Sequence, residues 1–459
     1  MAQGGKTTEK TAGKTTQRAP TPTGRVRSDS DSLSVSLTPP FRDWPAIADP
    51  APREEQTAEA RRDAGLDPAR PVLASGHQPV VYHPGIVAKL IALDAWASRT
   101  GAQALWIVPD MDAVDPASVR IPESSADDLT VREIHLGQDP LEGPASAMPP
   151  IEPRADAPEA FRPLIDRLRA HAGEPSRARQ MTHAVLDDLC DRLGLTRPAV
   201  VFASDLIGSP AGASLVGALR EDLDAAVRAY NGAIERLPNT GVRPMSIGPD
   251  RVELPLWTVA PGRRTPVTVR RDAPLDDDHL APRGLLMTAI VRLTLCDAFI
   301  HGTGGLKYDR VTEAWIRDWL GSELAPMVGA SATLRLDLPL PESFTDPDRA
   351  SWEAHHARHD PDMLDEHARA RRKDELVRTI DAMKARGDDP SGPFDELQSL
   401  LDRTRRDHGP ELEDLRERAA WAQRFRAMRD IAADRTWAYP LHDHGALIAL
   451  RDAVRERMG

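Results

Sequence analysis

The stretch from residue 71 to residue 110 constrains the fold most, because it alternates between the patterns of a strand and a helix. Residues 71–75 form a short apolar run that ends in glycine, and residues 104–108 form a second one that ends at Pro109 and Asp110. Between them, residues 85–100 place apolar side chains at the spacing of one helix face. A strand, a loop, an amphipathic helix and a second strand make a βαβ unit, which predicts an α/β fold with a parallel sheet.

Composition divides the 459-residue chain into segments. Thr, Lys, Gly, Ser and Pro dominate residues 1–38, which predicts a disordered tail. The region from about residue 347 onward is densely charged and has apolar stripes, which predict an antiparallel coiled-coil arm. Further helices are expected at 213–236, 285–296 and 311–320, and a buried strand at 298–300. The predicted domains are a tail at 1–38, a Rossmann-like core at 39–346 with a proline-rich insertion around 116–156, a helical arm at 347–434, and a segment at 435–459 that returns to the core.

Charge and cysteine content narrow the classes of function. The formal net charge is −12, which disfavours a general nucleic-acid or anionic-membrane surface. The two cysteines, Cys190 and Cys296, lie far apart and have no metal-ligand spacing, which fits a reducing cytoplasm and argues against a disulfide framework. No apolar run reaches the roughly 20 residues that span a bilayer, and no signal sequence is recognised. We expect a cytoplasmic enzyme-like protein.

Lysine is rare in this chain, and its positions are informative. The 59 basic residues include only seven lysines, and between Lys14 and Lys373 the only ones are Lys89 and Lys307. Arginine is a wide planar fork, whereas lysine is a compact charge that can approach a single phosphate or carboxylate oxygen. Compositional drift that spared two lysines is the alternative. We predict that Lys89 and Lys307 are catalytic residues that neutralise developing negative charge.

The loop after the first strand combines donors with the beginning of a helix. It carries His77, Gln78 and His83, and Pro84 suits the first helical turn. In an open α/β sheet, ligands bind at the carboxyl ends of the strands, where helix amino termini favour anions. These residues are therefore predicted to bind a nucleotide or substrate. The alternative is a capped helix whose histidines satisfy the local backbone.

Carboxylates follow the second strand as Asp110, Asp112 and Asp115. At a strand end they can hold an ammonium group, position a ribose or bind Mg²⁺. The spacing lacks the glycine and the closing glutamate of a calcium loop. We predict binding roles for Asp110 and Asp112, and the same role for Glu253, which can instead be part of a sheet edge.

A second unusual loop runs from His301 to Asp309 and is rich in glycine. It is too short for a Walker A loop and has no Ser or Thr after its lysine. Glycines still allow close backbone approach to a ligand, and His301 can act with Lys307 on developing negative charge. We predict that His301 is catalytic and that the loop binds substrate through Gly302, Gly304, Gly305, Tyr308 and Asp309. A purely structural glycine turn is the alternative.

Two histidine groups look like metal ligands in the sequence but lack a supporting ligand set. They are His442-Asp443-His444 and His355-His356 with His359. Neither comes with cysteines or carboxylates at a recognised spacing. We therefore predict no protein metal centre.

The first loop and the second strand resemble those of the bacillithiol-biosynthesis cysteine-adding enzymes. The resemblance lies in Ser75-Gly76-His77-Gln78-Pro79, in the following helix with Lys89, and in the strand from Leu105 to Asp110 with Asp112. That family reads Thr-Gly-Gln-Gln at the first loop, and its second strand ends in acidic residues near a histidine. The match covers residues 70–115 and elsewhere only the layout. It implies a nucleotidylyltransferase-like core, similar in shape to class I aminoacyl-tRNA synthetases, with adenine-nucleotide binding and dimerisation through the helical arm.

Together these patterns predict a ligase or transferase that joins an amino acid, cysteine among the candidates, to a small acceptor. ATP or ADP is the expected nucleotide and Mg²⁺ the expected ion, and the expected assembly is a homodimer. The sequence leaves two alternatives open. One is a non-catalytic nucleotide- or sugar-phosphate-binding protein that acts through its helical arm, and the other is a degenerate enzyme kept as a dimeric scaffold.

Overall fold

The computed structural model describes residues 32–46, 55–125, 128–271, 279–340 and 346–459. The chain divides into two units. The described residues of the core unit lie within 32–123, 129–337 and 431–459, and those of the arm unit lie within 124–128 and 338–430. The core unit is a mixed α/β structure, as the sequence predicts.

A six-stranded sheet with the order β1-β11-β10-β2-β3-β6 forms the centre of the core unit. Five neighbouring strands are parallel, and β1 pairs antiparallel with β11 at one edge. The strands are β1 (Leu33–Thr38), β2 (Val72–Gly76), β3 (Gln103–Val108), β6 (Ala199–Phe202), β10 (Ala298–His301) and β11 (Met327–Leu334). All four connections between the parallel strands contain helices, and these helices cover both faces of the sheet.

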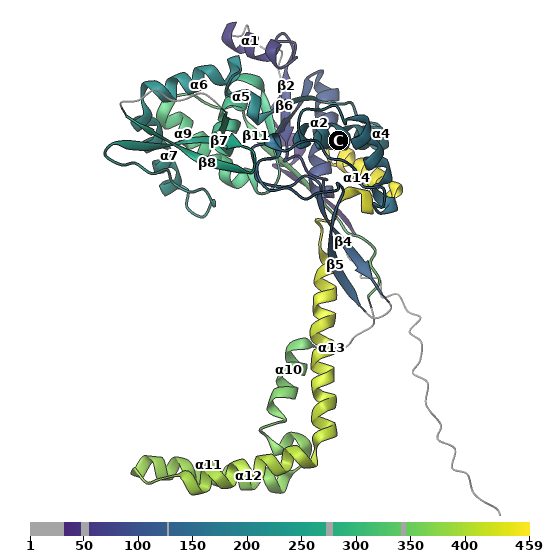
Figure 1. Cartoon of the computed structure of the whole chain (residues 1–459), viewed down its shortest axis with the longest axis vertical. Coiled ribbons are helices and arrows are strands. Elements are labelled where there is room, and N and C mark those ends of the chain that lie inside the picture. Colours follow the sequence, from purple (N-terminus) through teal and green to yellow (C-terminus); the bar gives the residue numbers. More distant parts are fainter. Residues whose placement is uncertain (1–31, 47–54, 126–127, 272–278, 341–345) are drawn as a thin grey trace, which may run out of the picture. The chain divides into compact units, whose positions relative to one another are not determined.

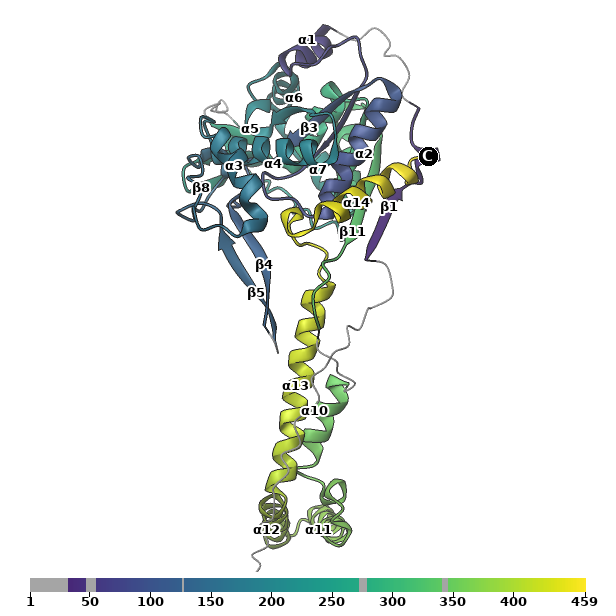
Figure 2. The same cartoon turned by 90° about the vertical axis from the view of Figure 1, so that its right-hand side faces the viewer.

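Two hydrophobic cores pack on the opposite faces of this sheet. Figures 1 and 2 show helices on both sides of it. Alternation along β2 directs Leu73 to one core and Val72 and Ala74 to the other. The first core contains α2 (Pro84–Thr100), α3 (Arg162–Ala170), α4 (Arg177–Leu193) and α14 (His444–Arg457). The second contains α1 (Glu55–Asp63), α5 (Ala203–Leu206), α6 (Pro210–Glu221), α7 (Leu223–Arg236), α8 (Gly284–Ile290) and α9 (Gly305–Leu320).

Two smaller sheets complete the strands. One pairs β4 (Ser118–Ser124) with β5 (Leu129–His135), and the other has the order β8-β7-β9, with β7 (Arg251–Ala260), β8 (Arg263–Arg270) and β9 (Leu280–Pro282). After α8 the chain makes one π-helical turn at Val291–Leu295. Short 3₁₀ turns lie at Phe41–Asp43, Ala145–Ala147, Glu159–Phe161, Pro361–Leu364 and Tyr439–Leu441.

The arm unit is helical. Its helices are α10 (Pro347–His356), α11 (His367–Arg386), α12 (Ser391–Asp407) and α13 (Gly409–Ala433). The last three residues of α13 belong to the core unit. Helices α11 and α12 pack against each other (Figures 1 and 2). Leu376 and Ile380 of α11 are buried, together with Leu400 and Leu401 of α12.

Three sequence predictions require correction. The sequence predicts a disordered tail up to residue 38, but Leu33–Thr38 form β1, because apolar and serine side chains alternate there. The rest of the predicted tail, residues 1–31, lies outside the described part of the chain. The single helix expected at 213–236 is two helices, because the Asp222 side chain caps the amino terminus of α7. The helix expected from residue 311 begins at Gly305, so Lys307, Tyr308 and Asp309 lie in its first turns rather than in a loop.

Candidate functional site

A cavity of about 430 Å³ lies where the carboxyl ends of β2, β3 and β10 meet. This is the position at which ligands bind in open parallel sheets. Both unusual loops of the sequence contribute to it. Of the predicted site residues, those that line the cavity are His77, Gln78, His83, Lys89, Asp112, His301, Gly302, Gly304, Gly305 and Tyr308.

Glycine at Gly76 and Gly85 lets the first loop approach its neighbours closely. A Cβ atom on Gly76 would lie 2.1 Å from the carbonyl oxygen of Ile107, and one on Gly85 would lie 2.8 Å from the His83 ring. His83 is the N-cap of α2, and its Nδ1 accepts a hydrogen bond of 3.1 Å from the Gly85 amide. The capping alternative is therefore part of the structure, although His83 also lines the cavity.

Lys89 is a buried cation at the floor of the cavity. Its side chain is 6% exposed, and its ammonium donates a 2.5 Å hydrogen bond to the Gly76 carbonyl and lies 5.7 Å from the centre of the Trp106 ring. Burial lowers the pKa of Lys89 to about 7. Among the described residues no carboxylate forms an ion pair with it. Lys89 thus lacks a compensating anion, which a ligand can supply.

The two histidines of the first loop are neutral at physiological pH. Burial, together with the smaller effect of the Lys89 charge, lowers the pKa of His77 to about 3. Burial also lowers the pKa of His83 to about 4, with added contributions from Arg435 and Lys89. Neutral imidazoles can donate or accept hydrogen bonds at a ligand without adding charge.

A buried network fixes His301 at the other side of the cavity. His301 Nε2 lies 2.9 Å from Asp309 Oδ2, which also accepts a 2.6 Å hydrogen bond from Arg292, while Asp309 Oδ1 accepts from Thr288 at 2.7 Å and Thr312 at 2.6 Å. Burial would raise the pKa of Asp309, but the hydrogen bond and charge of His301, with Arg292, hold it below its usual range. Asp309 is therefore a permanent carboxylate that orients the His301 ring.

The amino terminus of α9 forms the glycine-lined wall of the cavity. A Cβ atom on Gly305 would lie 2.4 Å from His301 Nδ1, so only glycine allows the ring this close to the helix. The hydrogen bonds found among the described residues do not use the backbone amides of Thr303, Gly304 and Gly305. Free amides at the beginning of a 16-residue helix favour an anion.

Asp112 links the first loop to the carboxyl end of β3. Its Oδ2 accepts a 2.8 Å hydrogen bond from Gln78, and its Oδ1 accepts from Arg264, with which it also forms an ion pair. The Arg264 guanidinium lies 4.6 Å from the centre of the Trp257 ring. Asp112 is thereby held at the cavity wall with its charge compensated.

Four predicted residues do not line this cavity, namely Lys307, Asp110, Glu253 and Asp309. Lys307 is exposed on α9, and Asp110 lines a second cavity. Glu253 is buried in ion pairs with Arg283, at 2.8 Å, and with Arg243, which identifies it as a structural charge pair of β7. Asp309 lies behind His301 rather than at the cavity surface.

Several residues of the cavity were missed by sequence reasoning. Arg435 reaches it from the segment after the arm, and Ser331 from β11, which pairs with β10. Thr288 and Met287 come from α8. No local sequence pattern marks these residues, because the sheet order brings together segments that are far apart in the chain.

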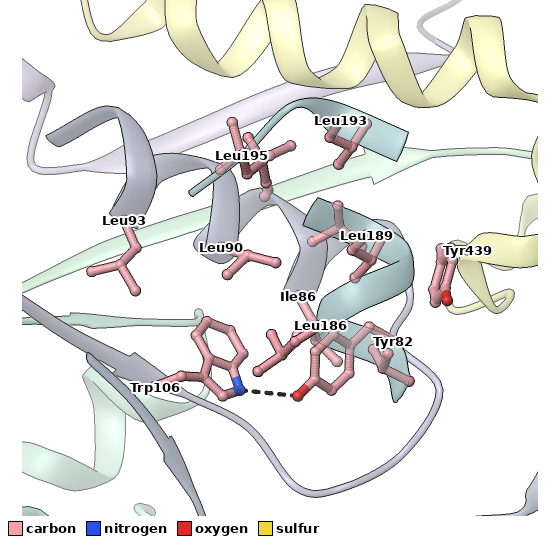
Figure 3. Close-up of a cluster of buried hydrophobic side chains, with 14 of the residues drawn as sticks. Tyr82, Ile86, Leu90, Leu93, Trp106, Leu186, Leu189, Leu193, Leu195 and Tyr439 are labelled. Atoms are coloured by element: carbon pink, nitrogen blue, oxygen red, sulfur yellow. Dashed lines mark hydrogen bonds between the residues drawn. The ribbon is translucent and has the colours of Figure 1, made fainter. Parts of the chain in front are cut away.

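The first loop is fixed by a buried cluster of hydrophobic side chains that includes Tyr82, Trp106 and Tyr439 (Figure 3). The Trp106 indole donates a 2.9 Å hydrogen bond to the Tyr82 hydroxyl, and the amide of Tyr439 donates one of 2.7 Å to the Tyr82 carbonyl. The Tyr439 hydroxyl in turn donates to Asp188 at 2.6 Å. The carboxyl-terminal segment therefore holds both the first loop and Arg435 against the core.

Comparison with known proteins adds no family name. No family model matches the chain, and no match is found among the curated proteins compared with it. The described residues contain no group of three or more histidines, cysteines or carboxylates arranged to hold a metal ion. Within the same described ranges, no helix has the length and apolar character needed to cross a membrane.

Proposed function

We propose that this protein is a nucleotide-dependent ligase or transferase that joins an amino acid, cysteine among the candidates, to a small acceptor. On this proposal the chain is a divergent relative of the bacillithiol-biosynthesis cysteine-adding enzymes, and its core is a Rossmann-like, nucleotidylyltransferase-like fold. The observation that carries the proposal is the cavity itself, which brings the first loop, Lys89 and the glycine-rich beginning of α9 together at the carboxyl end of a parallel sheet.

The groups around the cavity suit a phosphate-bearing ligand. Lys89 is a buried cation without a carboxylate partner among the described residues, and Arg435 adds a second positive charge. The amides of Thr303, Gly304 and Gly305 add hydrogen-bond donors that need no ionisation. A volume of about 430 Å³ lies within the range of small-ligand sites.

The proposed reaction has two steps. A carboxylate oxygen attacks a phosphorus atom of the nucleotide, which breaks a phosphoanhydride bond and releases pyrophosphate or ADP. An amine then attacks the activated carboxyl carbon, forms the amide, and expels AMP or phosphate while its proton leaves to a base. Lys89 and the α9 amides stabilise the charge on the transferred group, and His301, oriented by Asp309, is a proton donor or acceptor.

Mg²⁺ in this proposal accompanies the nucleotide rather than a prebuilt protein centre. Magnesium is commonly held by one or two carboxylates together with substrate phosphates. Asp112 is the carboxylate that lines the cavity, and its oxygens already accept from Gln78 and Arg264. The arrangement therefore fits an ion that takes most of its ligands from phosphate and water.

Isothermal titration calorimetry with ATP, ADP and AMP, with and without Mg²⁺, tests the nucleotide site. We expect Lys89→Met to weaken nucleotide binding by about 10- to 100-fold, since a hydrogen bond to a charged group contributes about 1.5–3 kcal/mol. Lys307→Met is the matched control, because Lys307 is exposed and does not line the cavity, and it should bind as the unaltered protein does. Absence of binding for every nucleotide would refute the proposal.

The second candidate function is a non-catalytic nucleotide- or sugar-phosphate-binding protein that acts through its arm. The observation in its favour is the exposure of large apolar side chains on the arm: Trp352 is 53% exposed and Phe394 is 49% exposed. Such side chains are typical of contact surfaces, and we propose that a second copy of the chain covers them to form a homodimer. Release of ADP or AMP that depends on an amino acid distinguishes the enzyme from the binding protein.

A further inference from the structure

A second cavity, of about 390 Å³, lies at the carboxyl ends of β3 and β6. Its wall includes Asp110 after β3, Ser204 after β6, Ser146, and Ser176 with Arg179 at the amino terminus of α4. The loop after β3 contributes to both cavities, since Met111 and Asp112 line the first and Asp110 lines the second.

Asp110 is a buried carboxyl group without a cation. Its side chain is 1% exposed; Oδ1 accepts a 2.9 Å hydrogen bond from the Ser204 amide, and Oδ2 accepts one of 2.6 Å from the Ser204 hydroxyl. These donors are neutral. Burial therefore raises the pKa of Asp110 to about 6, and the negative charge of Asp205 adds to the effect.

The other buried carboxylates of the described chain each have an arginine partner. The pairs are Asp94 with Arg455, Asp188 with Arg192, Glu253 with Arg283, and Asp309 with Arg292, at distances from 2.6 to 3.2 Å. No such ion pair is found for Asp110 within the described residues. Arg179, which is near, is held by Asp205 through two contacts of 2.7 and 2.6 Å. Because an unpaired buried charge is costly, the exception calls for a cation from outside the chain.

An unused hydroxyl group lies on the same wall. The Oγ atom of Ser146 is buried, lines the cavity, and has no hydrogen-bond partner among the described residues. Buried polar atoms are nearly always satisfied, so this one indicates a ligand or water. The Ser146 amide donates a 2.9 Å hydrogen bond to the Asp110 backbone carbonyl, so the two residues are neighbours on the wall of the cavity.

We propose that the second cavity binds a small primary amine, whose ammonium group pairs with Asp110 and donates to Ser146. The role of this amine as a reactant rests on the proposed ligase function, but its binding does not. The two sources of such a group are the amino acid that is joined and the acceptor molecule. The remaining ionisable groups at the cavity are the Arg179–Asp205 pair and His279, none of which supplies Asp110 with an ion pair.

Calorimetric titration with two kinds of amine tests the proposal without any nucleotide. L-cysteinamide and L-alaninamide represent amino acids, but without the carboxylate, so the ammonium is their only charge. Ethanolamine and serinol represent amino-alcohol acceptors. The N-acetyl derivatives lack the ammonium and are the ligand controls. We expect at least one amine to bind, its N-acetyl derivative not to bind, and the preferred kind to identify the source of the amine.

Asp110→Asn keeps the shape of the side chain and should weaken amine binding at least tenfold, and Ser146→Ala should weaken it less. Asp166→Asn removes an exposed carboxylate of α3 that lines neither cavity, and it is the matched control. If Asp110→Asn does not fold, Ser146→Ala and the N-acetyl ligand controls test the site.

Failure of all four amines to bind, or equal binding by Asp110→Asn, would overturn the inference. Loss of amine binding in Lys89→Met would also overturn it, because the amine would then lie in the first cavity. These results are distinct from failure of the proposed function, which is decided by nucleotide binding and turnover.

Discussion

Replacing Lys89 with methionine should make the protein more stable while weakening its nucleotide binding. Burial lowers the pKa of Lys89 from the usual 10.5 to about 7, so the folded chain holds its ammonium less favourably than the unfolded chain does. Because one pKa unit corresponds to about 1.4 kcal/mol, this difference destabilises the fold by about 4–5 kcal/mol at a pH well below 7. Methionine has a similar length and no charge, so we expect the free energy of unfolding to rise by about 2–4 kcal/mol at pH 7.

The pH dependence gives the sign of this effect independently. Between pH 7 and pH 10.5 the unfolded chain binds the lysine proton and the folded chain does not, so the stability of the unaltered protein rises with pH in this window. Lys89→Met lacks that contribution, and its advantage should shrink as the pH rises from 7 towards 10. Nucleotide binding should show the opposite trend in the unaltered protein, because a bound phosphate favours the charged lysine and affinity falls above pH 7.

Urea unfolding at several pH values between 6 and 9.5, with tryptophan fluorescence as the signal, measures how the stability of the unaltered protein and of Lys89→Met depends on pH. Lys307→Met controls for the loss of a lysine in general, since that side chain is exposed and its removal should change stability by less than about 0.5 kcal/mol. A destabilised Lys89→Met, or an advantage that is the same at every pH, would refute the view that Lys89 is an uncompensated buried cation.

The remaining predictions concern the His301 wall and the arm. Gly305→Ala should displace the His301 ring, because the added Cβ atom would lie 2.4 Å from His301 Nδ1. We expect turnover, measured by steady-state kinetics, to fall at least tenfold, and nucleotide affinity, measured by calorimetry, to change less. Gly304→Ala is the control, because its Cβ atom would meet no atom within 4 Å, and equal losses in both variants would contradict the argument. Trp352→Glu on the arm should shift a dimer towards monomer in sedimentation velocity, whereas Val131→Glu on β5 should not, and a dimer that is unaffected by Trp352→Glu would place the interface elsewhere.

Local patterns in the sequence predict the elements around the cavity well. The expected strand at 71–75, helix at 85–100 and strand at 104–108 appear as β2, α2 and β3 with ends that differ by at most one residue. Apolar periodicity, a proline at the first helical turn and Gly101 at the helix end are all local signals, and they agree with one another. The six-stranded order, in contrast, depends on pairing between distant segments.

The composition of the site depends on contacts that no local pattern reveals. Lys307 lies in a glycine-rich stretch, but the direction of its side chain is decided by where α9 begins and how it packs, and the structure leaves it exposed. Asp309 points inward because Arg292, in a π-helical turn, requires a carboxylate. Arg435 enters the cavity because Tyr439 anchors the segment that follows the arm. In each case a tertiary contact selects the residue.

The placement of unpaired charges separates binding sites from structural charge pairs in this fold. Buried carboxylates such as Asp309 and Glu253 are paired with arginines, and these pairs can be explained without any ligand. Lys89 and Asp110 are the buried groups of opposite sign that have no such partner among the described residues, and each lines a cavity. Since an unpaired buried charge lowers stability, each is best explained by a ligand of opposite charge. The first cavity is then suited to an anion and the second to a cation, which is the combination that a phosphate-activated reaction with an amine requires.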